Sequence, residues 1–175
     1  METLRARAME LAAPRIAPTT APQVRIVAFT WRNQSWAVDS DFIDEVIPVA
    51  SVTPLPNLAL TYLGLIHYRG EIYPVVDISS VFDIANGPRQ KPTHALLVKC
   101  NKGAIAIAAA GLEGASQVDA SAISPMAAET AKHPAFRGLT PGLAILFDPV
   151  HLLDDSRMIV NEQPATTASV EGILQ

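Results

Sequence analysis

The strongest constraint on the fold is a succession of short segments rich in β-branched and aromatic residues, each followed by turn-forming residues. Residues 24–31, Val-Arg-Ile-Val-Ala-Phe-Thr-Trp, are the first of these segments. A polar stretch at 32–35 separates it from a second short segment at 36–38. Such residues suit the pleated surface of a sheet, and a polar turn between two of them indicates a hairpin. The folded part of the chain therefore opens with a predicted β-hairpin.

A second pair of strands is predicted at residues 64–69 and 72–76, joined by an Arg-Gly turn. Pro74 falls inside the second of these strands and cannot donate a ladder hydrogen bond, so we expect that strand at an edge or a bulge. Asp77 follows it directly. Its carboxylate can accept a hydrogen bond from an early backbone N–H and so cap a short helix over residues 78–82.

Four acidic residues lie between these two pairs of strands: Asp39, Asp41, Asp44 and Glu45. One of residues 39–41 can cap a short helix that runs through Glu45. The group lacks the glycine and the ligand periodicity of a calcium-binding loop, so we expect a solvated helix face and no metal site.

The second half of the chain follows the same order. Predicted strands at residues 95–100 and 104–108 flank a turn in which Gly103 can supply a positive φ angle. A later strand at 143–147 precedes Asp148, which can cap a helix as Asp77 does.

The spacing of matching landmarks supports a duplication. Ile26 and Ala95 are 69 positions apart, and Gly64 and Gly138 are 74 positions apart. Two similar offsets between ordered landmarks predict an internal repeat of about 70 residues.

The short predicted strands and helices favour small closed barrels over an open sheet. A βαβ arrangement would need longer helices between its strands, and the one plausible longer helix lies around residues 125–133. We therefore predict an all-β fold, mainly strands with a few short helices, built from two small barrels.

The composition argues against several kinds of partner. A net charge of -4 and scattered lysines do not provide the basic face that nucleic acid or an anionic membrane requires. A single cysteine, Cys100, excludes an internal disulfide and fits a reducing compartment. No membrane-spanning run or signal peptide is recognisable, so we expect a cytoplasmic protein without direct membrane insertion.

No catalytic set is evident. The histidines, His67, His94, His133 and His151, are not at metal-ligand spacing from one another or from Cys100, and we expect each to lie at the surface or half-buried. Phosphate-binding, dinucleotide-binding and serine-nucleophile motifs are missing from the sequence. The sequence therefore predicts no catalytic residue, no cofactor and no metal.

Both ends of the chain are predicted to be flexible tails. Residues 1–22 contain three prolines that interrupt a weak helical pattern, and residues 161–175 have little to bury. The folded domain is expected to span residues 23–160.

One segment, residues 64–78, stands out from the rest. It contains His67-Tyr68-Arg69-Gly70 followed by Pro-Val-Val-Asp-Ile at 74–78. This resembles the N-L-R-G…P-V-x-D-L signature of CheW-like domains. The opening hairpin, the Ile-Asp-Glu-Val piece at 43–46 and the order of segments after Leu96 agree with the same family, so the resemblance covers about residues 24–154.

The resemblance implies an architecture and a role. The architecture is two small SH3-like β-barrels that share a core, here roughly residues 23–90 and 91–160, between which strands can be exchanged. The role is that of a non-catalytic adaptor in bacterial chemotaxis. Such a protein couples the cytoplasmic tips of methyl-accepting chemoreceptors to the regulatory domain of the histidine kinase CheA, in arrays at the membrane.

The resemblance also implies a partner-binding surface on the first barrel. Arg69 matches the signature arginine, and Glu45 matches an acidic position of the family; we expect the two to form an ion pair that fixes the turn. The other positions expected near this surface are Ile43, Gly64, His67, Tyr68 and Gly70. His67-Tyr68 departs from the family's Asn-Leu, and Tyr68 could serve as an aromatic anchor.

Two alternatives to a flagellar chemotaxis adaptor remain open, and a third is discounted. An adaptor of a non-flagellar system, such as type IV pilus motility, would have the same sequence features. A small β-barrel enzyme or ligand-binding protein would need convergent polar groups in a pocket, whereas the predicted strands offer mostly aliphatic residues. An adaptor with a phosphate-receiving domain is disfavoured, because the tails leave no room for that domain.

Overall fold

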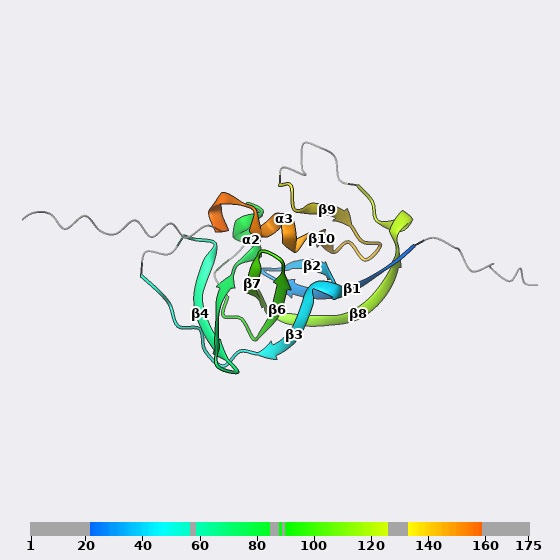
Figure 1. The fold of residues 1–175 in the computed structure, drawn as a ribbon. Helices are drawn as coiled ribbons and strands as arrows, with labels where there is room; N and C mark the ends of the chain where they lie inside the picture. The colour runs from blue at the N-terminus through cyan, green and yellow to red at the C-terminus, as the bar shows by residue number, and fades with distance from the viewer. Residues whose placement is uncertain (1–21, 57–58, 85–87, 89, 126–132, 159–175) are drawn as a thin grey trace, which may run out of the picture.

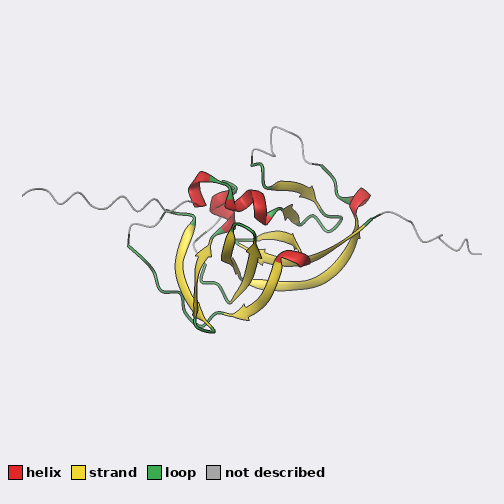
Figure 2. Ribbon diagram, in the orientation of Figure 1, coloured by secondary structure: helices red, strands yellow, loops and turns green. Residues whose placement is uncertain are grey.

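A computed structural model describes residues 22–56, 59–84, 88, 90–125 and 133–158. These residues form two five-stranded sheets with short helices between them (Figures 1 and 2). In spatial order, the first sheet contains β8 (Gly111–Asp119), β1 (Gln23–Trp31), β2 (Gln34–Asp39), β10 (Ile145–Phe147) and β9 (Phe136–Leu139). The second contains β3 (Ile43–Pro48), β6 (His94–Cys100), β7 (Gly103–Ala109), β5 (Glu71–Val76) and β4 (Tyr62–Tyr68).

The helices are all short. They are η1 (Ser40–Phe42), α2 (Ile78–Val81), η2 (Ala120–Ala122), α3 (Pro149–Leu153) and η3 (Ser156–Met158). Asp77 and Asp148 accept hydrogen bonds from backbone N–H groups at the starts of α2 and α3, as the sequence predicts. The all-β fold class is thus confirmed.

The two sheets have the same internal order. Each consists of a hairpin from one half of the chain and three strands from the other half: β1–β2 with β8, β9 and β10, and β6–β7 with β3, β4 and β5. In each sheet the last strand of the repeat pairs in parallel with the hairpin of the other half, β10 with β2 and β5 with β7. The predicted repeat is therefore present, and the halves exchange strands. The predicted boundaries at residues 22, 90 and 160 stay predictions.

Gly64 and Gly138 occupy equivalent places in the two halves. Their φ angles are +142° and +148°, and each precedes a leucine that pairs with a passing segment, Leu65 with Thr53 and Leu139 with Ser124. A Cβ at Gly64 would lie 2.2 Å from the Thr53 carbonyl oxygen, and one at Gly138 would lie 2.7 Å from that of Ser124. Only glycine allows this close approach of two backbones.

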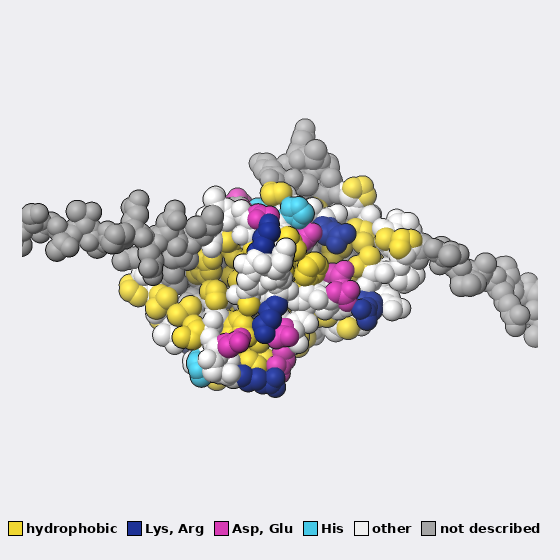
Figure 3. Space-filling model, in the orientation of Figure 1, with side chains coloured by type: hydrophobic (Ala, Val, Ile, Leu, Met, Phe, Trp, Pro, Cys, Tyr) yellow, Lys and Arg dark blue, Asp and Glu magenta, His cyan; other side chains and the backbone are white. Residues whose placement is uncertain are grey.

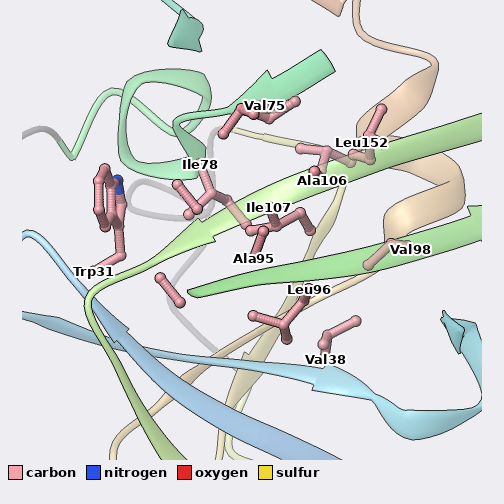
Figure 4. Packing of buried hydrophobic residues seen from close by; sticks show 14 of the residues in the cluster. Trp31, Val38, Val75, Ile78, Ala95, Leu96, Val98, Ala106, Ile107 and Leu152 are labelled. Carbon is pink, nitrogen blue, oxygen red and sulfur yellow. The ribbon is translucent and has the colours of Figure 1, made fainter. Parts of the chain in front are cut away.

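The main core lies between the two sheets and is shared by them. Figure 4 shows Trp31 and Val38 of the first sheet around the same cluster as Leu96 and Ile107 of the second, with Leu152 of α3 packed against it. These five side chains are fully buried. The four consecutive apolar residues of β6, Ala-Leu-Leu-Val, are all buried because the strand is covered on both faces.

A smaller cluster lies on the other face of the first sheet. Ile26, Ala37, Ala144 and Leu146 form it. Ala37 and Leu146 alternate along their strands with residues of the shared core, as period-two strands require. The first sheet therefore has apolar residues on both faces.

Several sequence predictions were wrong in detail. The expected helix through Glu45 is limited to η1, because Asp39 caps only one turn and the β-branched residues from Ile43 onward continue as β3. Pro74 does not lie on an edge strand, since β5 runs between β4 and β7. The proline is tolerated because β7 pairs only with the two residues after it, Val75 and Val76.

The second half also differs from its prediction. Strand β8 was not predicted, because its residues Gly-Leu-Glu-Gly-Ala-Ser-Gln-Val-Asp show no buried face. Leu143, expected in a strand, has a φ of +61° and belongs to a turn. Most of the predicted helix around 125–133 lies outside the described residues. None of the helices in the described part of the chain is long and apolar enough to cross a membrane.

Candidate functional site

The candidate site lies where the two edge strands of the second sheet, β3 and β4, approach each other at one end. Glu45 is on β3, and Tyr68 and Arg69 are at the end of β4. Arg69 Nη1 is 3.1 Å from Glu45 Oε2, and Nη2 donates to Glu45 Oε1 at 3.2 Å. The Tyr68 hydroxyl donates to the same Oε1 at 2.7 Å. These side chains join the two edges of the sheet where backbone pairing is missing.

The turn that presents Arg69 is a two-residue hairpin loop. Tyr68 pairs with Glu71, and the two residues between them have positive φ angles, 49° at Arg69 and 84° at Gly70. Two-residue hairpins favour such angles because they match the twist of the strands. Gly70 supplies the second angle without a steric penalty, so the local sequence fixes where the guanidinium lies.

The Glu45–Arg69 contact has the geometry of a bidentate pair and is exposed. The Arg69 side chain is 71% exposed and that of Glu45 is 33% exposed. An ion pair in this setting stabilises a fold by about 0–1 kcal/mol. The Arg69 guanidinium also lies 5.1 Å from the centre of the Tyr68 ring. The pair holds the guanidinium in one orientation while leaving much of it open to solvent.

A second charged cluster lies beside the first. The Lys99 ammonium on β6 is 2.8 Å from the Asp44 carboxylate and 4.0 Å from that of Glu71. The Tyr73 hydroxyl donates to Glu71 at 2.5 Å. The side chains of both charged clusters line one open depression of about 170 Å³. Figure 3 shows acidic and basic side chains interleaved beside the lower end of the β4–β5 hairpin.

The hydrogen bonds shift the ionisation of the donors. Donation to Glu45 raises the pKa of Tyr68, and donation to Glu71 raises the pKa of Tyr73, because losing the proton would place two negative charges side by side. The Asp44 carboxylate raises the pKa of Lys99. Both tyrosines therefore stay neutral hydrogen-bond donors, and Lys99 stays charged, across the physiological range.

The acidic residues expected on a helix face are instead divided among separate cations. Asp41 pairs with Arg25, Asp44 with Lys99, and Glu45 with Arg69. Across the described residues, no three His, Cys, Asp or Glu side chains are grouped so that they could hold a metal ion.

The other predicted site residues are distributed around this contact. Ile43, half-buried, begins β3 and pairs with Val98. Gly64 is buried at the far end of β4, where it permits the backbone approach described above. His67 is exposed and points to the opposite face of β4 from Tyr68, since adjacent strand residues alternate. The structure thus gathers Glu45, Tyr68 and Arg69, and leaves these three residues outside the contact.

An apolar surface adjoins the turn on the outer face of the hairpin. We call it the hairpin patch; it consists of Leu55, Leu65, Ile72 and Pro74. Pro74 pairs with Leu65 and Ile72 with His67, so these residues share one face of β4–β5. Ile72 is 65% exposed. Leu55, Leu65 and Pro74 also line an apolar depression of about 360 Å³. Figure 3 shows hydrophobic side chains gathered over the β4 side of the molecule.

Sequence reasoning missed the role of Asp77 beyond its helix cap. Its carboxylate is fully buried and accepts a hydrogen bond from Trp31 Nε1 at 2.7 Å. Arg32, 7% exposed and at the tip of the β1–β2 turn, forms an ion pair with it at 2.5 Å. Because Arg32 belongs to the first sheet and Asp77 follows β5 of the second, this contact links the two sheets. Its partners are 45 and 46 positions away, so no local pattern could reveal it.

His133 departs from the expectation of a surface or half-buried position. It is 7% exposed and packs 4.7 Å from the ring of Phe82. Its Nδ1 accepts a hydrogen bond from the Ala135 N–H, so Nε2 carries the proton that faces the Asp155 carboxylate at 2.5 Å. Both ring nitrogens are thus engaged in structural contacts.

Comparisons with known proteins agree with the fold and with the signature. The model of the CheW-like domain family matches residues 25–157. The chemotaxis protein CheW of Thermotoga maritima is 32% identical over 63 residues, which cover 36% of this chain and 42% of that protein. The aligned part thus spans about two-fifths of the relative's length.

A solved structure has the same fold. It is the crystal structure of the scaffolding protein TtCheW from Thermoanaerobacter tengcongensis, with a TM-score of 0.65 and 20% sequence identity. The alignment covers 81% of this chain and 94% of that one. This likeness identifies the two barrels as SH3-like. Because the family model covers most of the chain and includes both barrels, the chain belongs to the CheW-like domain family.

Proposed function

We propose that this chain is a non-catalytic adaptor that couples chemoreceptors to a CheA-type histidine kinase, and that the Arg69 turn is part of the surface that binds one of them. Membership of the CheW-like family supports an adaptor role in chemotaxis. The observation that carries the proposal is the orientation of a largely exposed guanidinium by Glu45 on a two-residue hairpin turn.

The composition of this surface suits protein recognition. A guanidinium held in one orientation loses little conformational entropy on binding, and it can form bidentate contacts with a partner's carboxylate. Exposed Ile72 lies on the other face of the same hairpin, within the hairpin patch. A charged contact beside an apolar surface is the usual composition of an interface rim and core.

Coupling requires only differential binding. If one receptor state binds the adaptor–kinase complex more tightly than the other, the kinase equilibrium shifts by that difference in free energy. No bond is made or broken on the adaptor. The proposed place of action is a receptor array at the cytoplasmic side of the membrane, reached through partners and not through membrane insertion.

Charge reversal at Arg69 tests the proposal. Arg69→Glu should weaken binding to a CheA regulatory domain or to a receptor signalling tip by at least about tenfold, because a desolvated interface arginine is commonly a binding hot spot. Isothermal titration of each partner measures this effect. Arg25→Glu is the matched control, since Arg25 also forms an exposed ion pair, with Asp41. Equal affinity of the Arg69→Glu variant and the unchanged chain for both partners would overturn the proposal.

A charge swap separates direct contact from positioning. In the double variant Glu45→Arg with Arg69→Glu, the internal pair can form with reversed polarity. Recovered binding would mean that the pair acts by shaping the turn, whereas continued loss would mean that a partner contacts the guanidinium itself. The motility output, flagellar or pilus-based, is identified by the receptors and kinase encoded beside this chain.

A further inference from the structure

An apolar groove lies beside β4 and is open to solvent. It is the depression of about 360 Å³ that Leu55, Leu65 and Pro74 help to line, and we call it the apolar groove. Both halves of the chain contribute to it: β4, β5 and the connector before them from the first half, and β7, α3 and η3 from the second. Leu55 is 41% exposed. An open surface of this kind is stabilised when an apolar segment covers it.

The described chain ends at this groove. Met158, the last described residue, is itself part of the lining. The Tyr62 hydroxyl donates to its carbonyl oxygen at 2.7 Å, and both residues are buried. Figure 1 shows the described C-terminal end, in orange, on the same side of the molecule as β4, whereas β1 begins on the opposite side. Residues 159–175 therefore start at the groove, and residues 1–21 join the fold far from it.

The sequence after Met158 contains an apolar group that fits this groove. Residues 161–169 include no Val, Ile, Leu, Met or aromatic residue, and Val170, Ile173 and Leu174 follow them. In a helical turn this i, i+3, i+4 spacing places the three side chains on one face. The intervening residues, 161–169, can span about 30 Å when extended, whereas the seven residues of β4 extend over about 23 Å. The apolar group can therefore reach any point along β4.

The charges of the groove and of the segment are complementary. Lys102 contributes a positive charge to the lining of the groove. Residues 159–175 contain two acidic residues, Glu162 and Glu171, and no lysine, arginine or histidine. Glu171 lies between Val170 and Ile173 in the sequence, so a segment seated in the groove brings a carboxylate towards the Lys102 side.

We propose that residues 170–174 dock in the apolar groove of the same chain, with Val170, Ile173 and Leu174 against its lining. A short tether supplies its ligand at an effective concentration on the order of millimolar, so a weak apolar contact is enough to keep the groove occupied. The groove is thus a binding site for a short apolar segment with an acidic residue, and its resident occupant is part of this chain.

The docking has a consequence for the hairpin patch. Leu55, Leu65 and Pro74 belong both to the patch and to the apolar groove. A partner that binds the patch must first displace residues 170–174, which lowers its apparent affinity by the fraction of chains that are docked. This consequence rests on the proposed function, whereas the docking itself does not.

A spin label at the end of the segment tests the docking. The full chain carries Cys100→Ser and Gln175→Cys, with a nitroxide on the new thiol, and amide signals are recorded by NMR. The label should broaden the amides of Gly103 and Ala104, which line the groove, and leave that of Gly114 on β8 sharp. Equal broadening of all three would overturn the proposal.

Three controls separate docking from mere tethering. Ile173→Ser with Leu174→Ser keeps the tether and the label but should lose the broadening at the groove. Leu55→Glu should also lose it, whereas Leu60→Glu should retain it, because Leu60 is 71% exposed and does not line the groove. Broadening that persists in the serine variant would mean that the tether alone causes it. In a mixture of labelled chain with unlabelled, isotope-enriched chain the broadening should be absent; its presence would mean docking between copies and would overturn the proposal.

Partner binding gives an independent measurement. The variant with serine at 173 and 174 should bind the partner that Arg69→Glu weakens at least about threefold more tightly than the unchanged chain, because no docked segment has to be displaced. Broadening at the groove together with unchanged partner affinity would confirm the docking and contradict the use of the hairpin patch by that partner. The failure of the docking and the failure of the proposed function are thus distinguishable.

Discussion

Replacing Asp77 with asparagine should destabilise the fold more than any surface substitution discussed above. The Asp77 carboxylate is fully buried and receives four donors: Trp31 Nε1, Arg32 Nη2, and the backbone N–H and hydroxyl of Ser80. An asparagine has one acceptor oxygen in place of two, and its amide group would face a donor. Arg32, 7% exposed, would keep its charge with no anion beside it.

The expected cost follows from this burial. Removing one partner of a buried ion pair costs about 3–5 kcal/mol, because the remaining charge stays desolvated. With a urea m-value of about 1–3 kcal/mol/M for a domain of this size, the unfolding midpoint should fall by about 1–5 M. Trp31 and Trp36 are fully buried, so tryptophan fluorescence reports the transition.

Asp148→Asn provides the matched control. Asp148 caps α3 as Asp77 caps α2, but the side chain beside its carboxylate, His151, is 56% exposed. Asparagine caps a helix about as well as aspartate, so this substitution should cost less than about 1 kcal/mol. The double variant Asp77→Asn with Arg32→Met removes the isolated charge and should recover part of the loss. If Asp77→Asn cost no more than Asp148→Asn, the buried pair would not connect the sheets as described.

Three further predictions concern the backbone and the tyrosines. Gly64→Ala should cost clearly more stability than Gly70→Ala in urea unfolding, because a Cβ at Gly64 meets the Thr53 carbonyl at 2.2 Å while one at Gly70 meets nothing within 4 Å; equal losses would contradict the close approach. Glu45→Gln should lower the pKa of Tyr68 towards its ordinary value of 10, as seen in the tyrosinate absorbance titration and absent in a Tyr68→Phe background; an unchanged titration would remove Glu45 as the cause. Burial raises the pKa of Tyr62 above 10, so the native state retains a proton that the unfolded chain loses. Stability should therefore fall as pH rises above 10, and Tyr62→Phe should reduce this slope; an identical slope in the variant would refute the assignment.

Local patterns in the sequence were sufficient for much of the fold. The β-branched segments, the turn at Arg69-Gly70 and the caps at Asp77 and Asp148 each depend on neighbouring residues, and the structure confirms them. The repeat was visible because Gly64 and Gly138 meet the same backbone requirement in both halves.

What could not be predicted depends on distant contacts. Strand β8 carries no hydrophobic alternation, since its stability comes from backbone pairing with β1 and not from a buried face. The Arg32–Asp77 pair joins residues 45 positions apart. The contact between Glu45 and Arg69 was expected from the family signature, and the structure contains it; the hydrogen bond from Tyr68 to Glu45 was not expected.

Recruitment of the kinase to receptors tests the central claim most directly. Membranes bearing a chemoreceptor are mixed with a CheA-type kinase, with and without this chain, and the kinase that sediments with them is measured. The adaptor account predicts that the kinase sediments with the membranes only when the chain is added, and that Arg25→Glu supports this recruitment while Arg69→Glu does not. Kinase that sediments equally with and without the chain would contradict an adaptor role.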